Sequence, residues 1–289
     1  MEKWRKEEIR VCSSRRALPG HSRTFILGGG TNLLISDEGF DGLVLKPEVM
    51  KLESNGVMVK VGAGVSVATL LHYCITHNLS GLEWAGGLPG TVGGAIRGNA
   101  GAFGGECKDI TRSVQSMDIQ TQTIRERKAK ECTFGYRTSC YKTSAKNEII
   151  ISATLALSRG KRNAIRKTIK EKIAYRMARH PMEYPNIGSI FKNVPFSLIK
   201  SKPYFSDCVG KAMPVKQDPF PIVPAAYFIH ETGLKGVSFG GAMISPKHPN
   251  FIVNVCDAAS DDVKRLIALA KHEVKERFTI DLEEEIQIV

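Results

Sequence analysis

The sequence predicts an α+β protein of two domains, and three observations lead to this prediction. The chain has 289 residues, of which 42% are hydrophobic, so it can bury a sizeable core. Short apolar runs alternate with glycine-rich turns in the first half, as is typical of strands joined by tight connections. Amphipathic helical patterns dominate the second half. We place the boundary after residue 158, which gives domains of residues 1–158 and 159–289.

The first domain is predicted to be rich in strands. The apolar runs that predict them are residues 24–27, 43–45, 57–61, 113–117 and 149–157. Asn55-Gly56 lies between two apolar runs and is the strongest hairpin signal in the chain.

A helix is predicted between two of these strands. Ser66 can cap its first turn, and Asn78 can end it. The apolar residues expected to face the sheet are Leu70, Leu71, Cys74 and Ile75. This helix over a set of strands favours a layered α+β or α/β arrangement.

The second domain is predicted to open with a basic helix over residues 159–179, in which Ile165, Ile169 and Ile173 recur on one face. The stretch from Pro195 to Pro224 has no sustained period, so we expect an insertion or lid there.

The end of the chain is predicted to form a helix and then a strand. Ser260 is the expected cap of the helix, and the strand is expected to cover residues 280–289. The residues that share the apolar face of the helix are Val263, Leu266, Ile267, Ala270, Val274 and Phe278.

Composition excludes several classes of protein. No apolar stretch approaches the roughly 18 residues needed to span a bilayer, and the first residues lack a secretory signal, so we expect a cytoplasmic protein without membrane insertion. The seven scattered cysteines include no C-x-x-C pair, so we expect reduced thiols and no metal site. The net charge of +12 accompanies no nucleic-acid-binding motif, and we expect nucleotide-like anions as ligands.

Three glycine-rich connections in the first half predict a site built from backbone. Gly28-Gly29-Gly30 follows a strand, and Gly62-Ala63-Gly64 follows another, but neither has the third glycine of a Rossmann fingerprint. Between Gly86 and Gly105, nine of twenty residues are glycine. Glycine lets a diphosphate approach the backbone closely, so the diphosphate of FAD or of a nucleotide sugar would suit such loops.

Several sequence blocks in the chain resemble one family, the UDP-N-acetylenolpyruvoylglucosamine reductases. The blocks occur in the family's order from about residue 24 to the end, and they cover residues 28–34, 87–95, 98–104, 136–139, 188–193, 233–236, 245–251 and 282–286. The resemblance implies a FAD-binding domain of the vanillyl-alcohol-oxidase (PCMH) type, followed by a smaller α/β substrate domain. Only 27 residues precede Gly28, so we expect the FAD-binding domain to be shortened at its N-terminus. The second subtype of the family fits better, because the tyrosine-bearing loop of the other subtype has no clear counterpart.

The resemblance also implies an activity. FAD, reduced by NADPH, would reduce the enolpyruvyl group of UDP-N-acetyl-3-O-(1-carboxyvinyl)-glucosamine to give UDP-N-acetylmuramate, a precursor of peptidoglycan. Arg137 matches the arginine that binds the substrate carboxylate, Ser189 the proton donor and Glu285 the C-terminal catalytic glutamate. Lys192 and Asn193 match positions that contact the substrate. No obligate protein partner is evident.

The glycine blocks imply the residues that would hold FAD. These are Gly28, Gly30, Thr31, Asn32, Gly87, Pro89, Gly90, Thr91, Gly93, Gly94, Asn99 and Gly101. Two alternatives remain open from the sequence: another FAD oxidoreductase of the same fold, and a degenerate reductase that acts as a non-catalytic binding protein.

Overall fold

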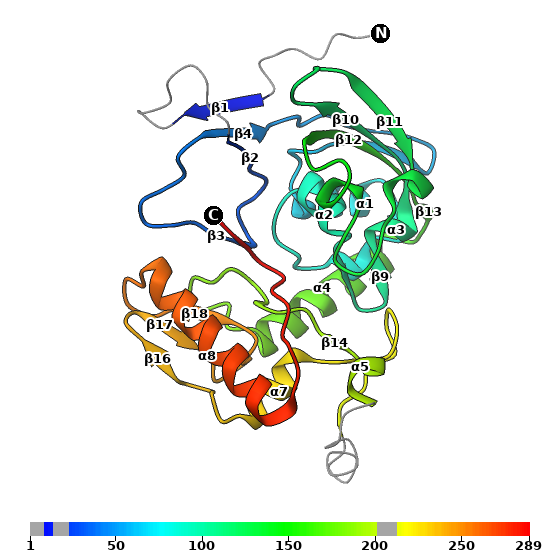
Figure 1. The fold of residues 1–289 in the computed structure, drawn as a ribbon. Helices are drawn as coiled ribbons and strands as arrows, with labels where there is room; N and C mark the ends of the chain where they lie inside the picture. Colours follow the sequence, from blue (N-terminus) through cyan, green and yellow to red (C-terminus); the bar gives the residue numbers. More distant parts are fainter. Residues whose placement is uncertain (1–8, 14–22, 201–212) are drawn as a thin grey trace. The chain divides into compact units, whose positions relative to one another are not determined.

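The computed structural model describes residues 9–13, 23–200 and 213–289. The chain forms two compact units, which Figure 1 colours along the sequence. The first contains residues 1–30 and 40–175, and the second contains residues 31–39 and 176–289. Within the described part of the chain, no helix is long and apolar enough to cross a membrane.

The first unit is built on a five-stranded antiparallel sheet with the order β11-β10-β12-β6-β5. Its strands are β5 (Leu52–Asn55), β6 (Met58–Gly62), β10 (Thr111–Asp118), β11 (Ile124–Lys128) and β12 (Glu148–Ala156). β12 lies in the centre and is buried along most of its length, which explains its almost continuous apolar sequence. The hairpin predicted at Asn55-Gly56 is confirmed, since β5 and β6 pair directly across it.

A second sheet of the first unit has the order β1-β4-β2. Its strands are β1 (Ile9–Ser13), β2 (Thr24–Ile26) and β4 (Leu43–Pro47). β2 and β4 are parallel, so the chain must cross over between them. Residues 31–39 of this crossover belong to the second unit.

Three α-helices of the first unit are α1 (Val67–Thr76), α2 (Val92–Gly98) and α3 (Cys107–Ile110). The predicted cap of α1 is confirmed, because the Ser66 hydroxyl accepts a hydrogen bond from the Thr69 N–H at 2.9 Å. Leu70, Leu71 and Cys74 are buried as expected. Asn78 has the left-handed φ of 56° that ends the helical path.

Shorter elements complete this unit. They are β7 (Leu79–Ser80), β8 (Gly101–Ala102), β9 (Gly105–Glu106), β13 (Ser158–Arg159) and the 3₁₀ turns η2 (Glu83–Ala85), η3 (Ala129–Cys132) and η4 (Cys140–Lys142).

The basic helix is α4 (Arg162–Arg179). Ile165 and Ile169 are buried in the core of the first unit, although the predicted boundary assigned the whole helix to the second domain. The expectation for Ile173 was wrong, since 40% of this residue is exposed. The apolar face of α4 is therefore shorter than the periodicity predicted.

The second unit combines helices with short strands. Its described helices are α5 (Phe196–Lys200), α7 (Ala225–Glu231) and α8 (Ser260–Phe278). Its strands are β3 (Leu33–Leu34), β14 (Val194–Pro195), β15 (Ile222–Val223), β16 (Ser238–Phe239), β17 (Ala242–Ile244), β18 (Ile252–Asn254) and β19 (Gln287–Ile288). α8 packs against β16, β17 and α7, and its predicted apolar face is largely buried.

Three predictions for the second unit need correction. Ser260 is the first residue of α8 and not its cap; the Asp262 carboxylate instead accepts the Ala259 N–H at 3.0 Å. The final strand is reduced to β19, which pairs with β3 in parallel. The stretch predicted to be irregular contains α5 and the β14–β15 pair, while residues 201–212 lie outside the described residues.

A buried ion pair stabilises the five-stranded sheet. The Arg127 guanidinium binds both carboxylate oxygens of Glu148, one of them at 2.7 Å, and Ser116 donates a further bond at 2.6 Å. Burial alone would raise the pKa of Glu148, but the bonds from Arg127 and Ser116 outweigh burial and hold it below its usual value.

We predict that Glu148→Gln lowers the free energy of unfolding by ~3 kcal/mol at pH 7, because it leaves the half-buried Arg127 charge without its carboxylate. The measurement is a urea titration. A lowered folded pKa gives stability that is complete above the unfolded value of 4.5 and is lost as pH falls through the folded pKa. The difference between wild type and variant should therefore shrink below about pH 4.5.

The control is Glu53→Gln, which removes an exposed pair with Lys51 whose two side chains are 50% and 45% exposed. It should cost less than ~1 kcal/mol. Equal losses from both variants would contradict the role of the buried pair.

Candidate functional site

Two of the predicted glycine loops meet in the first unit. A Cβ atom on Gly29 would lie 2.8 Å from the Gly90 Cα atom, closer than side chains tolerate. A Cβ on Gly28 would lie 3.2 Å from the Thr91 hydroxyl. The sequence therefore needs glycine here, because backbone packs against backbone.

Backbone hydrogen bonds fix the second of these loops. The Val67 N–H donates to the Gly90 carbonyl at 3.0 Å, and the Gly93 N–H donates to the Ala63 carbonyl at 2.9 Å. Thr91 precedes α2, and its hydroxyl accepts the Gly94 N–H at 3.4 Å. The loop is thus held against the connection after β6 without help from long side chains.

A cavity lies between these loops and the central sheet of the first unit. Its lining residues are Ile26, Gly28, Pro47, Ala63, Thr91, Gly93, Gly94, Arg97, Tyr141, Glu148 and Ile150. Four predicted cofactor residues, Gly28, Thr91, Gly93 and Gly94, are therefore brought together. The Thr91 hydroxyl and the Arg97 guanidinium are donors that suit a diphosphate, and glycine lets a diphosphate approach the backbone closely, so the residues present fit FAD.

The other predicted cofactor residues of the first unit lie outside this lining. Gly87 and Pro89 precede Gly90 in the loop, and Gly101 begins β8. Asn99 is completely buried, and its side chain donates to the Gly135 carbonyl at 2.9 Å and accepts the Lys108 N–H at 2.9 Å. Asn99 thus supports the turn that follows Gly135.

That turn carries Arg137. Gly135 and Thr138 exchange two backbone hydrogen bonds, of 3.0 and 3.2 Å, so the two residues between them form a tight turn. Arg137 has a left-handed φ of 56°, which is uncommon for a residue with a side chain and is found more often at functional positions. Its guanidinium lies 5.4 Å from the centre of the Tyr136 ring.

Ser189 and Glu285 are brought together in the second unit. The Glu285 N–H donates to the carbonyl of Ile190, next to Ser189, at 2.7 Å. The Lys192 N–H donates to the Glu283 carbonyl at 2.9 Å, so the two segments remain paired two residues further along. The predicted proton donor and the predicted catalytic glutamate therefore belong to paired backbone segments.

Asn250 binds the same segment, and the sequence alone did not single it out. Its side chain accepts the Phe191 N–H at 2.9 Å and donates to the Phe191 carbonyl at 2.8 Å, while its own carbonyl accepts the Ile190 N–H at 2.9 Å. Asn250 is 3% exposed. The signal available was its place in the block of residues 245–251.

Thr31 and Asn32 also belong to the second unit. The Asn32 side chain donates to the Glu285 carbonyl at 3.0 Å, and its carbonyl accepts the Gln287 N–H at 3.1 Å. Thr31 is exposed, and its carbonyl lies 3.7 Å from where a Cβ on Gly188 would stand. These predicted cofactor residues therefore adjoin the segments of Ser189 and Glu285.

The three consecutive glutamates differ in their partners. Glu283 forms an ion pair with Lys192, and Glu284 forms one with Lys271 of α8 at 2.7 Å. Glu285 is half-buried. Glu283 and Glu284 are thus engaged with lysines.

Asn193 has a structural contact that the sequence did not predict. Its side-chain oxygen accepts the N–H of Ala225, the first residue of α7, at 3.2 Å. This hydrogen bond satisfies a backbone N–H at the start of α7.

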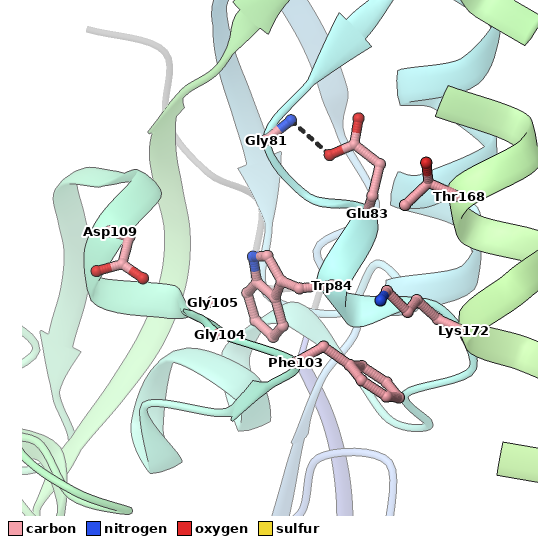
Figure 2. Close-up of a pocket in the computed structure, with 9 residues that line it drawn as sticks. All are labelled: Gly81, Glu83, Trp84, Phe103, Gly104, Gly105, Asp109, Thr168 and Lys172. Atoms are coloured by element: carbon pink, nitrogen blue, oxygen red, sulfur yellow. Dashed lines mark hydrogen bonds between the residues drawn. The ribbon is translucent and has the colours of Figure 1, made fainter. Parts of the chain in front are cut away.

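A separate hollow of about 440 Å³ lies elsewhere in the first unit, and Figure 2 shows the residues that line it. None of them is a predicted site residue. The Glu83 carboxylate accepts the Gly81 N–H at 2.7 Å, and Asp109 accepts the Glu106 N–H at 2.8 Å. Lys172 lies over the Phe103 ring at 4.6 Å. The charged side chains that line the hollow, those of Glu83, Asp109 and Lys172, thus stabilise the local fold.

Comparison with known proteins identifies both parts of the chain. Residues 9–126 match the model of a FAD binding domain, and residues 180–289 match the C-terminal domain of UDP-N-acetylenolpyruvoylglucosamine reductase. The expected fold class, a FAD-binding domain followed by a substrate domain of this family, is confirmed.

Full-length relatives agree with these matches. The UDP-N-acetylenolpyruvoylglucosamine reductase of Listeria monocytogenes is 34% identical over 265 residues, which covers 91% of this chain and 79% of the relative. The reductase of Syntrophus aciditrophicus is 38% identical over 271 residues, or 91% of this chain and 77% of the relative. The crystal structure of the Thermus caldophilus reductase superposes with a TM-score of 0.71 at 29% identity, covering 92% of this chain and 85% of that one. The chain belongs to the UDP-N-acetylenolpyruvoylglucosamine reductase family.

Proposed function

We propose that this enzyme uses NADPH to reduce UDP-N-acetyl-3-O-(1-carboxyvinyl)-glucosamine to UDP-N-acetylmuramate, with FAD as cofactor, in peptidoglycan precursor synthesis. The observation that carries the proposal is the pairing of the Ser189 and Glu285 segments in the second unit of a chain of this family. Gly28, Thr91, Gly93 and Gly94 would hold FAD, which when bound would supply hydride transfer from NADPH to C3 of the enolpyruvyl group. The residues must then bind the substrate and deliver one proton to C2.

Arg137 is proposed to bind the substrate carboxylate. A guanidinium forms two parallel hydrogen bonds with a carboxylate, and these bonds strengthen as negative charge develops on the carboxylate during reduction. The tight turn and the Lys142 side chain, which donates to the Arg137 carbonyl at 2.9 Å, hold the backbone of this residue.

Ser189 is proposed to give its proton to C2, and Glu285 to assist beside the substrate carboxylate. A serine hydroxyl is a weak acid, so it needs a neighbour that shares or relays the proton. Both residues are half-buried on paired segments.

Lys192 is proposed to bind the UDP-sugar diphosphate. It now pairs with Glu283, whose side chain is 71% exposed, and pairs with such exposed carboxylates contribute little to stability. Lys192 could therefore exchange this carboxylate for a phosphate at small cost. Asn193 would then also contact the sugar nucleotide. UDP-sugars and NADPH are cytoplasmic metabolites, so we propose a cytoplasmic location.

The test of the function is an absorbance spectrum of the purified protein with FAD. We expect NADPH to bleach the flavin band, and UDP-N-acetylglucosamine enolpyruvate to restore it without oxygen. If the chain were a non-catalytic binding protein, NADPH would not bleach the flavin band. If it were another oxidoreductase of this fold, NADPH would bleach the band but this substrate would not restore it.

We predict that Ser189→Ala leaves reduction by NADPH nearly intact and slows reoxidation by the enolpyruvyl substrate about 10²- to 10⁴-fold, as expected when a general acid is lost. Stopped-flow absorbance separates the two half-reactions. Ser238→Ala, at an exposed serine of β16, is the control and should change neither rate. An equal fall in both half-reactions of Ser189→Ala would make Ser189 structural.

Glu285→Gln and Arg137→Ala should also slow reoxidation, about 10²-fold or more, because each removes a group that we propose acts on the reacting carboxylate. The matched control is Glu284→Gln, which removes the adjacent carboxylate that pairs with Lys271 and should leave reoxidation within about twofold. Normal turnover in Glu285→Gln or Arg137→Ala would remove that residue from the mechanism.

A further inference from the structure

Arg97 is a charged residue in the glycine-lined cavity of the first unit, and neither the glycine motifs nor the family's catalytic residues account for it. It lies in the last turn of α2, three and four residues after Gly94 and Gly93, so all three share one helical face. The cavity lining contains all three residues.

The guanidinium of Arg97 has no acidic partner among the residues that the structure describes. Glu148 also lines the cavity, but both of its carboxylate oxygens are bound by Arg127. Burial lowers the pKa of Arg97, which remains protonated because arginine starts from a very high value. The cavity therefore carries a net positive charge.

A desolvated charge without a counterion is costly, and a bound anion would remove that cost. Arg97 lines the cavity together with Thr91, the residue that precedes α2 and carries a hydroxyl. The Thr91 hydroxyl in turn adjoins Gly28 of the other glycine loop. A guanidinium and a hydroxyl thus line one cavity beside Gly28.

We propose that Arg97 binds the diphosphate of FAD and sets the affinity for this cofactor. The inference rests on the proposed function, because it takes FAD as the occupant of the cavity. A diphosphate offers several charged oxygens to this mixed set of donors, and a guanidinium matches their geometry with two parallel bonds. Arg97 is a binding residue, and the chemistry of reduction does not depend on it.

The test is FAD titration of the flavin-free protein, followed by the change in flavin fluorescence. Arg97→Ala should raise the dissociation constant about 10- to 100-fold, the usual loss for a charge-assisted hydrogen bond. Arg97→Lys keeps the charge and should recover part of the affinity. The control is Arg112→Ala, which removes an exposed arginine of the same unit and should leave the affinity unchanged.

The midpoint potential of the bound flavin, measured at saturating FAD, shows whether Arg97 acts on the diphosphate or on the flavin ring of FAD. We expect wild type and Arg97→Ala to have equal potentials. A lower potential in the variant with unchanged FAD affinity would overturn the proposal, since it would place the charge beside the ring. If Arg97→Ala does not fold, Arg97→Gln takes its place, and equal affinities for FAD in Gln, Lys and wild-type proteins would overturn the proposal.

The same titration separates this inference from the proposed function. A wild-type protein that binds no FAD would overturn both. A wild-type protein that binds FAD and is reduced by NADPH, with an Arg97→Ala variant of equal affinity, would overturn the role of Arg97 alone.

Discussion

The proposed chemistry depends on one set of hydrogen bonds, those by which Asn250 holds residues 190 and 191. The Asn250 side chain satisfies both backbone groups of Phe191, and its carbonyl accepts the Ile190 N–H. The Ile190 carbonyl then accepts the Glu285 N–H. Asn250 is buried, so the loss of any of these bonds would leave a polar group unsatisfied in the core. These hydrogen bonds fix the register between the backbone segments of Ser189 and Glu285.

The two units position their site residues by different physical means. In the first, glycine allows two loops to approach at backbone distance, and the resulting cavity places the Thr91 hydroxyl and the Arg97 guanidinium beside them. In the second, side-chain amides of Asn250 and Asn32 tie neighbouring segments together. Backbone suits a cofactor with a diphosphate, whereas side chains suit a site that must donate a proton at one atom.

Much of the fold was predictable because local chemistry agrees with the tertiary structure. The Asn55-Gly56 hairpin and the Ser66 cap need only their neighbours, and both are confirmed. The predictions for Ile173 and for the final strand were wrong, because the periodicity of a sequence does not show how far the surfaces that a helix or strand packs against extend. Arg97 was missed for a related reason. Its charge is noticeable only once the structure places it beside Gly93 and Gly94, with Glu148 already bound to Arg127. The motifs did select the segments of Ser189 and Glu285, which lie 96 positions apart in the chain and pair in the structure.

The most direct test of the shared register is amide hydrogen exchange in Asn250→Ala, compared with wild type under conditions where both are fully folded. Loss of the side chain removes a bond from Phe191 directly and releases Glu285 only through the Ile190 segment. We predict that the amides of Phe191 and Glu285 both exchange at least about tenfold faster in the variant. Faster exchange at Phe191 with unchanged protection at Glu285 would contradict the account, because the two segments would then keep their positions independently.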